Sequence, residues 1–156
     1  MRSPLLRRLH NFLVLDWTLK SLVIEAAAGL LIARLLLLLV PFPVLSRRLG
    51  SFVSPTDPRV TAPKAMENVE QKRVVWTVGW AVALAARNLP FKAVCLPQAM
   101  AAKTMLGRRG ISSIMHFGAG FGTVKPIDAH AWLDAAGMPV TGYPISPDIA
   151  EIACFV

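Results

Sequence analysis

Two residues of this sequence, Cys95 and His130, could together carry out nucleophilic catalysis. Pro97 follows Cys95 by two positions, and a helix tolerates proline only in its first turn, so Cys95 is predicted to begin a helix. Unpaired N–H groups and the helix dipole favour a thiolate at that position. His130 can accept the thiol proton if its segment packs against this helix. An inert buried thiol and an ordinary core histidine are the alternatives.

The segments around Cys95 and His130 predict an α+β fold, in which the cysteine-bearing helix packs on a small antiparallel sheet. Residues 127–134 alternate between two kinds of side chain, which places His130 and Trp132 on one face of a strand. A strand over residues 114–118 precedes it, and a returning strand over residues 139–143 follows it. The turn after the first strand is assigned to three glycines: Gly118, Gly120 and Gly122.

Length and composition predict one domain, residues 1–156, with two unlike halves. The chain is 54% hydrophobic, which excludes a disordered protein. Residues 1–109 carry 16 basic and 5 acidic groups, whereas residues 110–156 carry 1 and 4. The basic half is also the apolar half, so we do not expect nucleic-acid binding. Two cysteines and the lack of a signal-peptide pattern predict a reducing, cytoplasmic location.

The first part of the domain, residues 1–64, is predicted to be helical and to end in a proline-containing linker over residues 51–64. A short amphipathic helix is expected over residues 5–19. The second part, residues 65–156, should begin with a helix over residues 65–87. Its packed face is predicted from four residues at helical spacing: Val69, Trp76, Trp80 and Leu84.

The apolar stretch that begins at Leu22 and ends at Val40 would form about 28 Å of helix, close to the thickness of a bilayer core. Its leucine, isoleucine and valine residues outweigh the cost of Arg34 on an insertion scale. Arg34 lies where a spanning helix tolerates charge least, and basic residues flank both ends. Three interpretations are open: a core helix, a helix that contacts a membrane surface, and a transmembrane span.

Three sequence blocks carry a family resemblance: PFKAVCLPQAM at residues 90–100, LGRRGI at residues 106–111 and AHAWL at residues 129–133. They resemble the transglutaminase-like leader peptidase of lasso-peptide biosynthesis, often called the B protein. The resemblance implies a papain-like core and a cysteine peptidase that removes the leader from a ribosomally made precursor. Cys95 would be the nucleophile and His130 the general base and acid. The N–H groups of Cys95 and Leu96 would form the oxyanion hole, and no cofactor or metal is expected.

The residue that orients the imidazole departs from the family pattern. An acid is expected about twelve residues after His130, where this sequence has Gly142. We select Asp148, because the carboxy-terminal segment could fold back over the site. Trp132 and Gln98 are expected to bind substrate. The other carboxylates considered are Asp128, Asp134 and Glu151.

The resemblance also implies partners: the precursor peptide, a separate leader-recognition protein and the lasso cyclase. The amino-terminal half lacks the alternating strands of a recognition domain, which predicts a stand-alone peptidase. Contact with a membrane through residues 22–40 would make it membrane-associated.

Three other functions compete with the peptidase. A zinc site could use four residues, although the sequence has no CxxC or HxxxH pair: Cys95, His116, His130 and Cys154. The chain could instead be a membrane-associated scaffold or interaction protein. A transglutaminase-like enzyme could also transfer the acyl group to an amine instead of water, with the same nucleophile and base.

Overall fold

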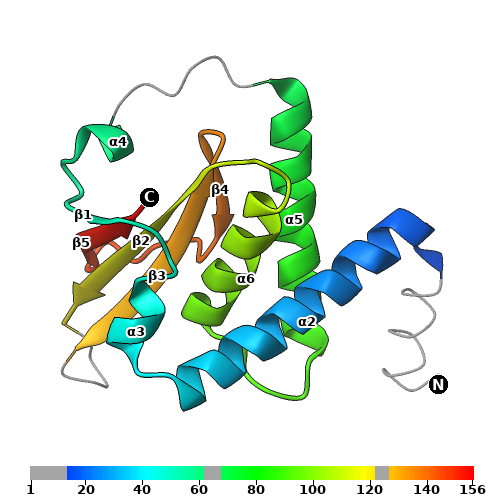
Figure 1. Cartoon of the computed structure of the whole chain (residues 1–156), viewed down its shortest axis with the longest axis horizontal. Coiled ribbons are helices and arrows are strands. Elements are labelled where there is room, and N and C mark those ends of the chain that lie inside the picture. The colour runs from blue at the N-terminus through cyan, green and yellow to red at the C-terminus, as the bar shows by residue number, and fades with distance from the viewer. Residues whose placement is uncertain (1–13, 62–67, 122–126) are drawn as a thin grey trace.

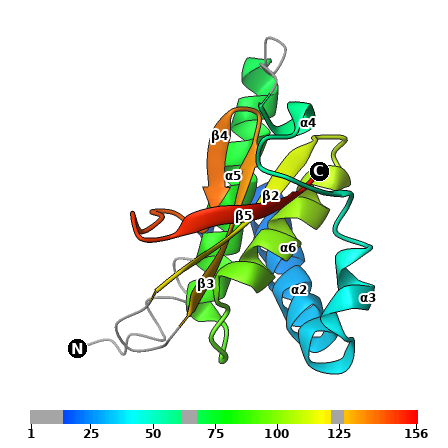
Figure 2. The ribbon, with the colours of Figure 1, turned by 90° about the vertical axis from the view of Figure 1, so that its left-hand side faces the viewer.

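The computed structural model describes residues 14–61, 68–121 and 127–156. Within these ranges, α5 and α6 pack against one side of a five-stranded sheet, and α2 packs on α5 and α6 (Figure 1), which confirms the predicted α+β class. Figure 2 shows β5 and β2 in front of α6. The helices are α2 (Trp17–Leu39), α3 (Phe42–Ser46), α4 (Pro58–Thr61), α5 (Val69–Asn88) and α6 (Cys95–Gly107).

The sheet has the strand order β1-β5-β2-β3-β4, and every neighbouring pair is antiparallel. Its strands are β1 (Phe52–Val53), β2 (Ser113–Gly120), β3 (Asp128–Ala135), β4 (Met138–Thr141) and β5 (Ala150–Phe155). The predicted linker is more structured than expected, since it contains β1 and α4. β1 forms there because Phe52 and Val53 pair with the end of β5, so the last strand of the chain holds this segment in the sheet.

The boundaries of α2 follow from local chemistry. Asp16 caps the helix by accepting a hydrogen bond from the Thr18 N–H (3.3 Å). The expected helix over residues 5–19 lies mostly outside the described residues, and its last part belongs to α2. The helix ends at Leu39 because Pro41 lacks the N–H that a further turn would require.

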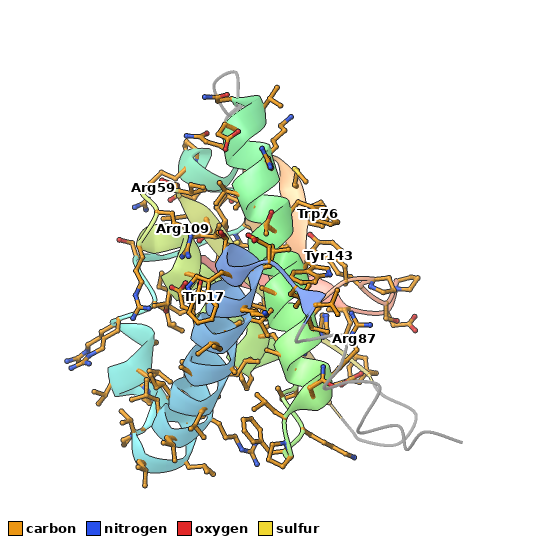
Figure 3. All side chains as sticks on the ribbon, turned by 90° about the vertical axis from the view of Figure 1, so that its right-hand side faces the viewer. Trp17, Arg59, Trp76, Arg87, Arg109 and Tyr143 are labelled. Carbon is orange, nitrogen blue, oxygen red and sulfur yellow. The ribbon has the colours of Figure 1, made fainter. Side chains whose placement is uncertain are left out.

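Helix α2 is long and apolar enough to cross a membrane by length and composition alone. In the structure one stripe of it is buried against α5 and α6: Val23, Ala26, Leu30 and Ala33. A Cβ on Gly29 would lie 3.2 Å from the Ala101 Cβ, so small residues allow α2 and α6 to approach closely. Glu25 adds an ion pair with Arg109, at 2.7 Å, on the side of the molecule seen in Figure 3.

The buried face of α5 agrees only in part with the predicted one. Trp80 and Leu84 pack partly buried against the core, whereas Val69 and Trp76 are exposed (81% and 63%). The fully buried positions are Val75, Val78, Gly79, Ala81, Val82 and Ala85. The small side chains on this face let α5 lie close to β4, where a Cβ on Gly79 would come within 2.8 Å of the Val140 carbonyl oxygen. The large side chains at helical spacing therefore lie on the exposed side of this helix or at the edge of its buried face.

The predicted glycine turn also differs from the structure, because Gly118 and Gly120 belong to β2. A Cβ on Gly118 would lie 2.5 Å from the Ile149 Cγ2, and a Cβ on Gly120 would lie 2.2 Å from the Asp148 carbonyl oxygen. These glycines therefore permit the segment before β5 to cross β2 closely. Gly122, the third predicted turn residue, lies outside the described residues.

Candidate active site

Cys95 is the first residue of α6, as the sequence predicts. Val94 precedes the helix without a side-chain cap, and Pro97 is buried in the first turn. The first N–H groups of a helix have no partner within it, so those of Cys95 and Leu96 can bind an anion. The Cys95 side chain is only partly buried. This end of α6 therefore presents an accessible thiol beside potential oxyanion donors.

His130 is held by the backbone at the position where an acid is expected. Its Nε2 lies 2.6 Å from the Gly142 carbonyl oxygen. A carbonyl only accepts hydrogen bonds, so Nε2 must carry the proton, and Nδ1 is the acceptor in the neutral ring. Gly142 thus holds the His130 ring through its backbone carbonyl, without having a side chain.

The conformation of Gly142 is one that other residues rarely adopt. Its φ is +84°, and a Cβ there would lie 2.5 Å from the Ala131 carbonyl oxygen and 2.8 Å from the Trp132 Cα. The residue therefore packs directly on the backbone of β3. A side chain at this position would displace the carbonyl from His130.

A cavity of about 260 Å³ lies beside this hydrogen bond, between α5, α6 and the end of β4. It is lined by Ala83, Gln98 and residues 139–143. Gln98 lies one turn after Cys95 and donates a hydrogen bond to the Ala93 carbonyl (2.6 Å). Tyr143 also lines the cavity and lies next to α5 (Figure 3). The cavity therefore connects the first turn of α6 with the residue that holds His130.

The predicted site residues are not all brought together. No hydrogen bond joins Cys95 to His130, both of which are described. On β3, His130 and Trp132 lie on the face opposite Leu133, which packs in the helical core. Asp148 is exposed, and its carboxylate has no hydrogen bond or ion pair within the described ranges. Its catalytic role stays a prediction.

Trp132 is buried on the sheet between two histidines. The indole is 6% exposed and stacks against two imidazoles, with ring centroids 5.4 Å from His116 and 6.1 Å from His130. It is thus a spacer between the two histidines of the sheet. Gln98 lines the cavity. Substrate binding by Trp132 and Gln98 stays a prediction.

The second histidine belongs to a separate polar cluster. The His116 Nδ1 lies 2.5 Å from Glu151 Oε1 and 3.5 Å from the Cys154 Sγ, which donates to the same Oε1 at 2.9 Å. On the other side of the ring, Nε2 lies 3.5 Å from Asp134 Oδ2. Of the four residues considered for zinc, the structure joins only His116 and Cys154, and Glu151 completes the group.

The two cysteines differ in the electrostatics of their surroundings. Burial raises the pKa of the Cys154 thiol to about 12, and the hydrogen bond and negative charge of Glu151 act in the same direction. Cys154 is also fully buried, whereas Cys95 is partly accessible. Cys154 is therefore a poor nucleophile, although it lies beside a histidine and an acid.

A comparison with known protein families identifies the family of this chain. The model of the transglutaminase-like superfamily matches residues 36–151, which include α5, α6 and the central strands. This chain belongs to the transglutaminase-like superfamily. Curated proteins and solved structures give no significant match. The Cys95 helix and the His130 strand thus lie within a superfamily that suggests Cys-His peptidase or acyl-transfer chemistry.

Two features of this superfamily member could not be read from sequence patterns. The role of the Gly142 carbonyl was missed because backbone atoms carry no residue-type signal, although a glycine in place of an acid marked the position. Glu151 and Cys154 are three residues apart, so a regular strand would place them on opposite faces. A register shift opposite Phe117 and Gly118 brings them to the same side.

Proposed function

We propose that this transglutaminase-like protein is a cysteine peptidase that cleaves the leader from a ribosomally made lasso precursor. The observation that carries the proposal is the hydrogen bond from the His130 Nε2 to the Gly142 carbonyl. It fixes the imidazole in the tautomer whose Nδ1 can accept the thiol proton. Support also comes from Cys95 at the N-terminus of α6 and from the resemblance of its surrounding blocks to lasso leader peptidases.

In the proposed reaction, precursor binding closes the gap between the two catalytic side chains. Such hydrogen bonds often tighten only when substrate is bound. His130 takes the thiol proton, and Cys95 attacks the carbonyl carbon of the last leader residue. The N–H groups of Cys95 and Leu96 stabilise the oxyanion. His130 then protonates the leaving amine of the core peptide, and water hydrolyses the acyl-enzyme, which releases the leader acid and the thiol.

The cavity beside Gly142 is the proposed binding site for leader residues next to the cleaved bond. Its walls combine the Gln98 amide with apolar atoms of Ala83 and Val140. We propose the precursor as the substrate, with a separate leader-recognition protein that delivers it and a lasso cyclase that consumes the freed core. The exposed apolar side of α2, which includes Leu31, Leu35 and Leu38, is the proposed membrane contact.

The test is incubation of the full chain with a precursor and its recognition protein in ¹⁸O-labelled water, followed by mass spectrometry. We expect the leader to appear with one ¹⁸O at its new carboxyl terminus. Label-free leader joined to an added primary amine would instead identify an acyltransferase. No cleavage in the presence of precursor and recognition protein would contradict the peptidase.

A second experiment separates the Gly142 carbonyl from Asp148 as the group that orients His130. If the carbonyl is sufficient, Asp148→Asn should release leader at close to the unmodified rate. A loss of about 10³-fold or more would assign the orienting role to Asp148. Rates should be measured at saturating precursor, so that weaker binding does not imitate a catalytic defect.

A further inference from the structure

The polar cluster on the sheet face opposite α5 and α6 has no part in the proposed reaction. His116 comes from β2, and Glu151 and Cys154 come from β5. Their donor atoms all lie within 4.8 Å of one another. These residue types are a nitrogen, an oxygen and a sulfur ligand, the set that zinc and related ions use in proteins.

We propose that His116, Glu151 and Cys154 bind a divalent transition-metal ion of the zinc type, with Asp134 as the residue that positions the imidazole. This departs from the sequence expectation of no metal, which rested on spacing along the chain. Strand pairing and the shift beside Gly118 now bring the three ligands together. The ion would join β5 to β2.

The distances fit an ion of this size with little movement. Metal bonds of about 2.0–2.3 Å at tetrahedral angles place ligand atoms about 3.3–3.7 Å apart. The separation of 3.5 Å between the Cys154 Sγ and His116 Nδ1 already matches. Glu151 Oε1 is closer to both, and its side chain is 32% exposed, so it can withdraw toward solvent. A fourth position on the solvent side would be available to water.

The second observation that points to a ligand concerns the Nε2 atom, on the far side of the His116 imidazole from the cluster. The His116 Nε2 is buried without a hydrogen-bond partner, in a side chain only 9% exposed. It faces Asp134, which accepts a hydrogen bond from the Tyr143 hydroxyl (2.5 Å). With a metal on Nδ1, the proton lies on Nε2 and points to the Asp134 carboxylate. Metal-bound histidines are usually oriented in this way.

The proton balance of binding is simple. In the metal-free protein, the Cys154 thiol donates to Glu151. Binding replaces this hydrogen bond with a metal–thiolate bond and releases the thiol proton to solvent. The imidazole hydrogen moves from Nδ1 to Nε2 by exchange with water. One proton therefore leaves per ion bound, which makes affinity rise with pH.

Titration of the full chain with Co²⁺ alone tests the site, because a cobalt–thiolate bond gives a charge-transfer band in the near ultraviolet. We expect one Co²⁺ per chain with this band, displaced by Zn²⁺, and a Zn²⁺-dependent rise in melting temperature. Cys95→Ala is the matched control and should keep the band. Cys154→Ser should lose it.

Because Cys154 is buried and Cys154→Ser could fail to fold, two conservative variants at other residues test the same site. Glu151→Gln changes a partly exposed side chain and should weaken Co²⁺ binding while circular dichroism stays unchanged. Asp134→Asn should weaken it by about 10- to 100-fold with the band retained, since it acts through His116. A band lost in Cys95→Ala but kept in Cys154→Ser, or folded wild-type protein that binds no Co²⁺ at millimolar concentration, would overturn the proposal.

Discussion

Cys95 and Cys154 illustrate two ways in which one small sheet and its helices can surround a thiol. Cys95 begins α6, where it is partly accessible and close to unpaired backbone donors. Cys154 lies within β5, fully buried, and already donates to Glu151. The region that has a histidine and a carboxylate in contact with its cysteine is therefore the less reactive one. Contact among catalytic residue types is not sufficient, because the thiol must also ionise and reach a substrate.

The largest expected effect is the loss of leader cleavage in Cys95→Ala. We expect the rate to fall by at least about 10³-fold, because the variant lacks the proposed nucleophile. Cys154→Ala is the matched control. Once its folding is verified, its rate of leader cleavage should stay within about 3-fold of that of the unmodified chain, because Cys154 has no part in the proposed reaction. Mass spectrometry of released leader gives both rates. The reverse pattern would move the active site to the His116 cluster.

Thiol reactivity should separate the two regions next. We expect iodoacetamide to modify Cys95 at least about 10²-fold faster than Cys154 in metal-free protein at pH 8, because burial both hides Cys154 and keeps it protonated. The raised pKa of Cys154, about 12, means that its thiolate fraction keeps increasing with pH up to that value. Peptide mapping of the modified sites measures the ratio. Denatured protein, in which both should react similarly, is the control.

A smaller effect is expected from Gly142→Ala, which perturbs the carbonyl that holds His130. The added Cβ would contact the Ala131 carbonyl and the Trp132 backbone, so we expect leader release to fall by about 10- to 100-fold. The matched control is Gly110→Ala, where φ is +68° and nothing lies within 4 Å of the added atom. It should cost about 1 kcal/mol of stability with little change in rate. Equal rates in the two variants would show that the Gly142 carbonyl is dispensable.

The smallest effect is expected on stability, from the ion pairs between Glu25 of α2 and the arginines that follow α6. Hydrogen bonds from Arg109 and then Arg108 hold the pKa of Glu25 below its usual value. We expect Glu25→Gln to lower the free energy of unfolding by about 1 kcal/mol near neutral pH, after allowance for solvent screening, while cleavage at saturating precursor is retained. Chemical denaturation measures this difference.

The pH dependence of the same variant has a defined sign. A lowered carboxyl pKa stabilises the folded state above the ordinary value of 4.5, and this contribution is lost as pH falls through the folded pKa. The difference in the free energy of unfolding between wild type and Glu25→Gln should therefore shrink in acid. Glu70→Gln, which removes an exposed carboxylate without an ion pair among the described residues, should show a smaller gap. A gap that widened in acid would contradict the role of the ion pair.

Elements with local signals in the sequence were predictable before the structure. Pro97 located the start of α6, and the alternation around His130 located β3, because helix starts and strand periodicity depend on neighbours in the chain. Local signals were weaker for α5, where the residues of large volume at helical spacing include the exposed Val69 and Trp76. Close approach to β4 selected small residues for its buried face instead.

The folded arrangement of the strands determines which groups surround His130 and Cys154. The Gly142 carbonyl reaches His130 because the chain turns after β4 with a positive φ at Gly142. A backbone acceptor of this kind cannot be predicted from residue type, because every residue has a carbonyl. Likewise, Glu151 and Cys154 share a face because the pairing of β5 with β2 shifts beside Gly118. Register and loop closure depend on contacts between segments far apart in sequence, and these contacts gave this chain its two different thiol environments.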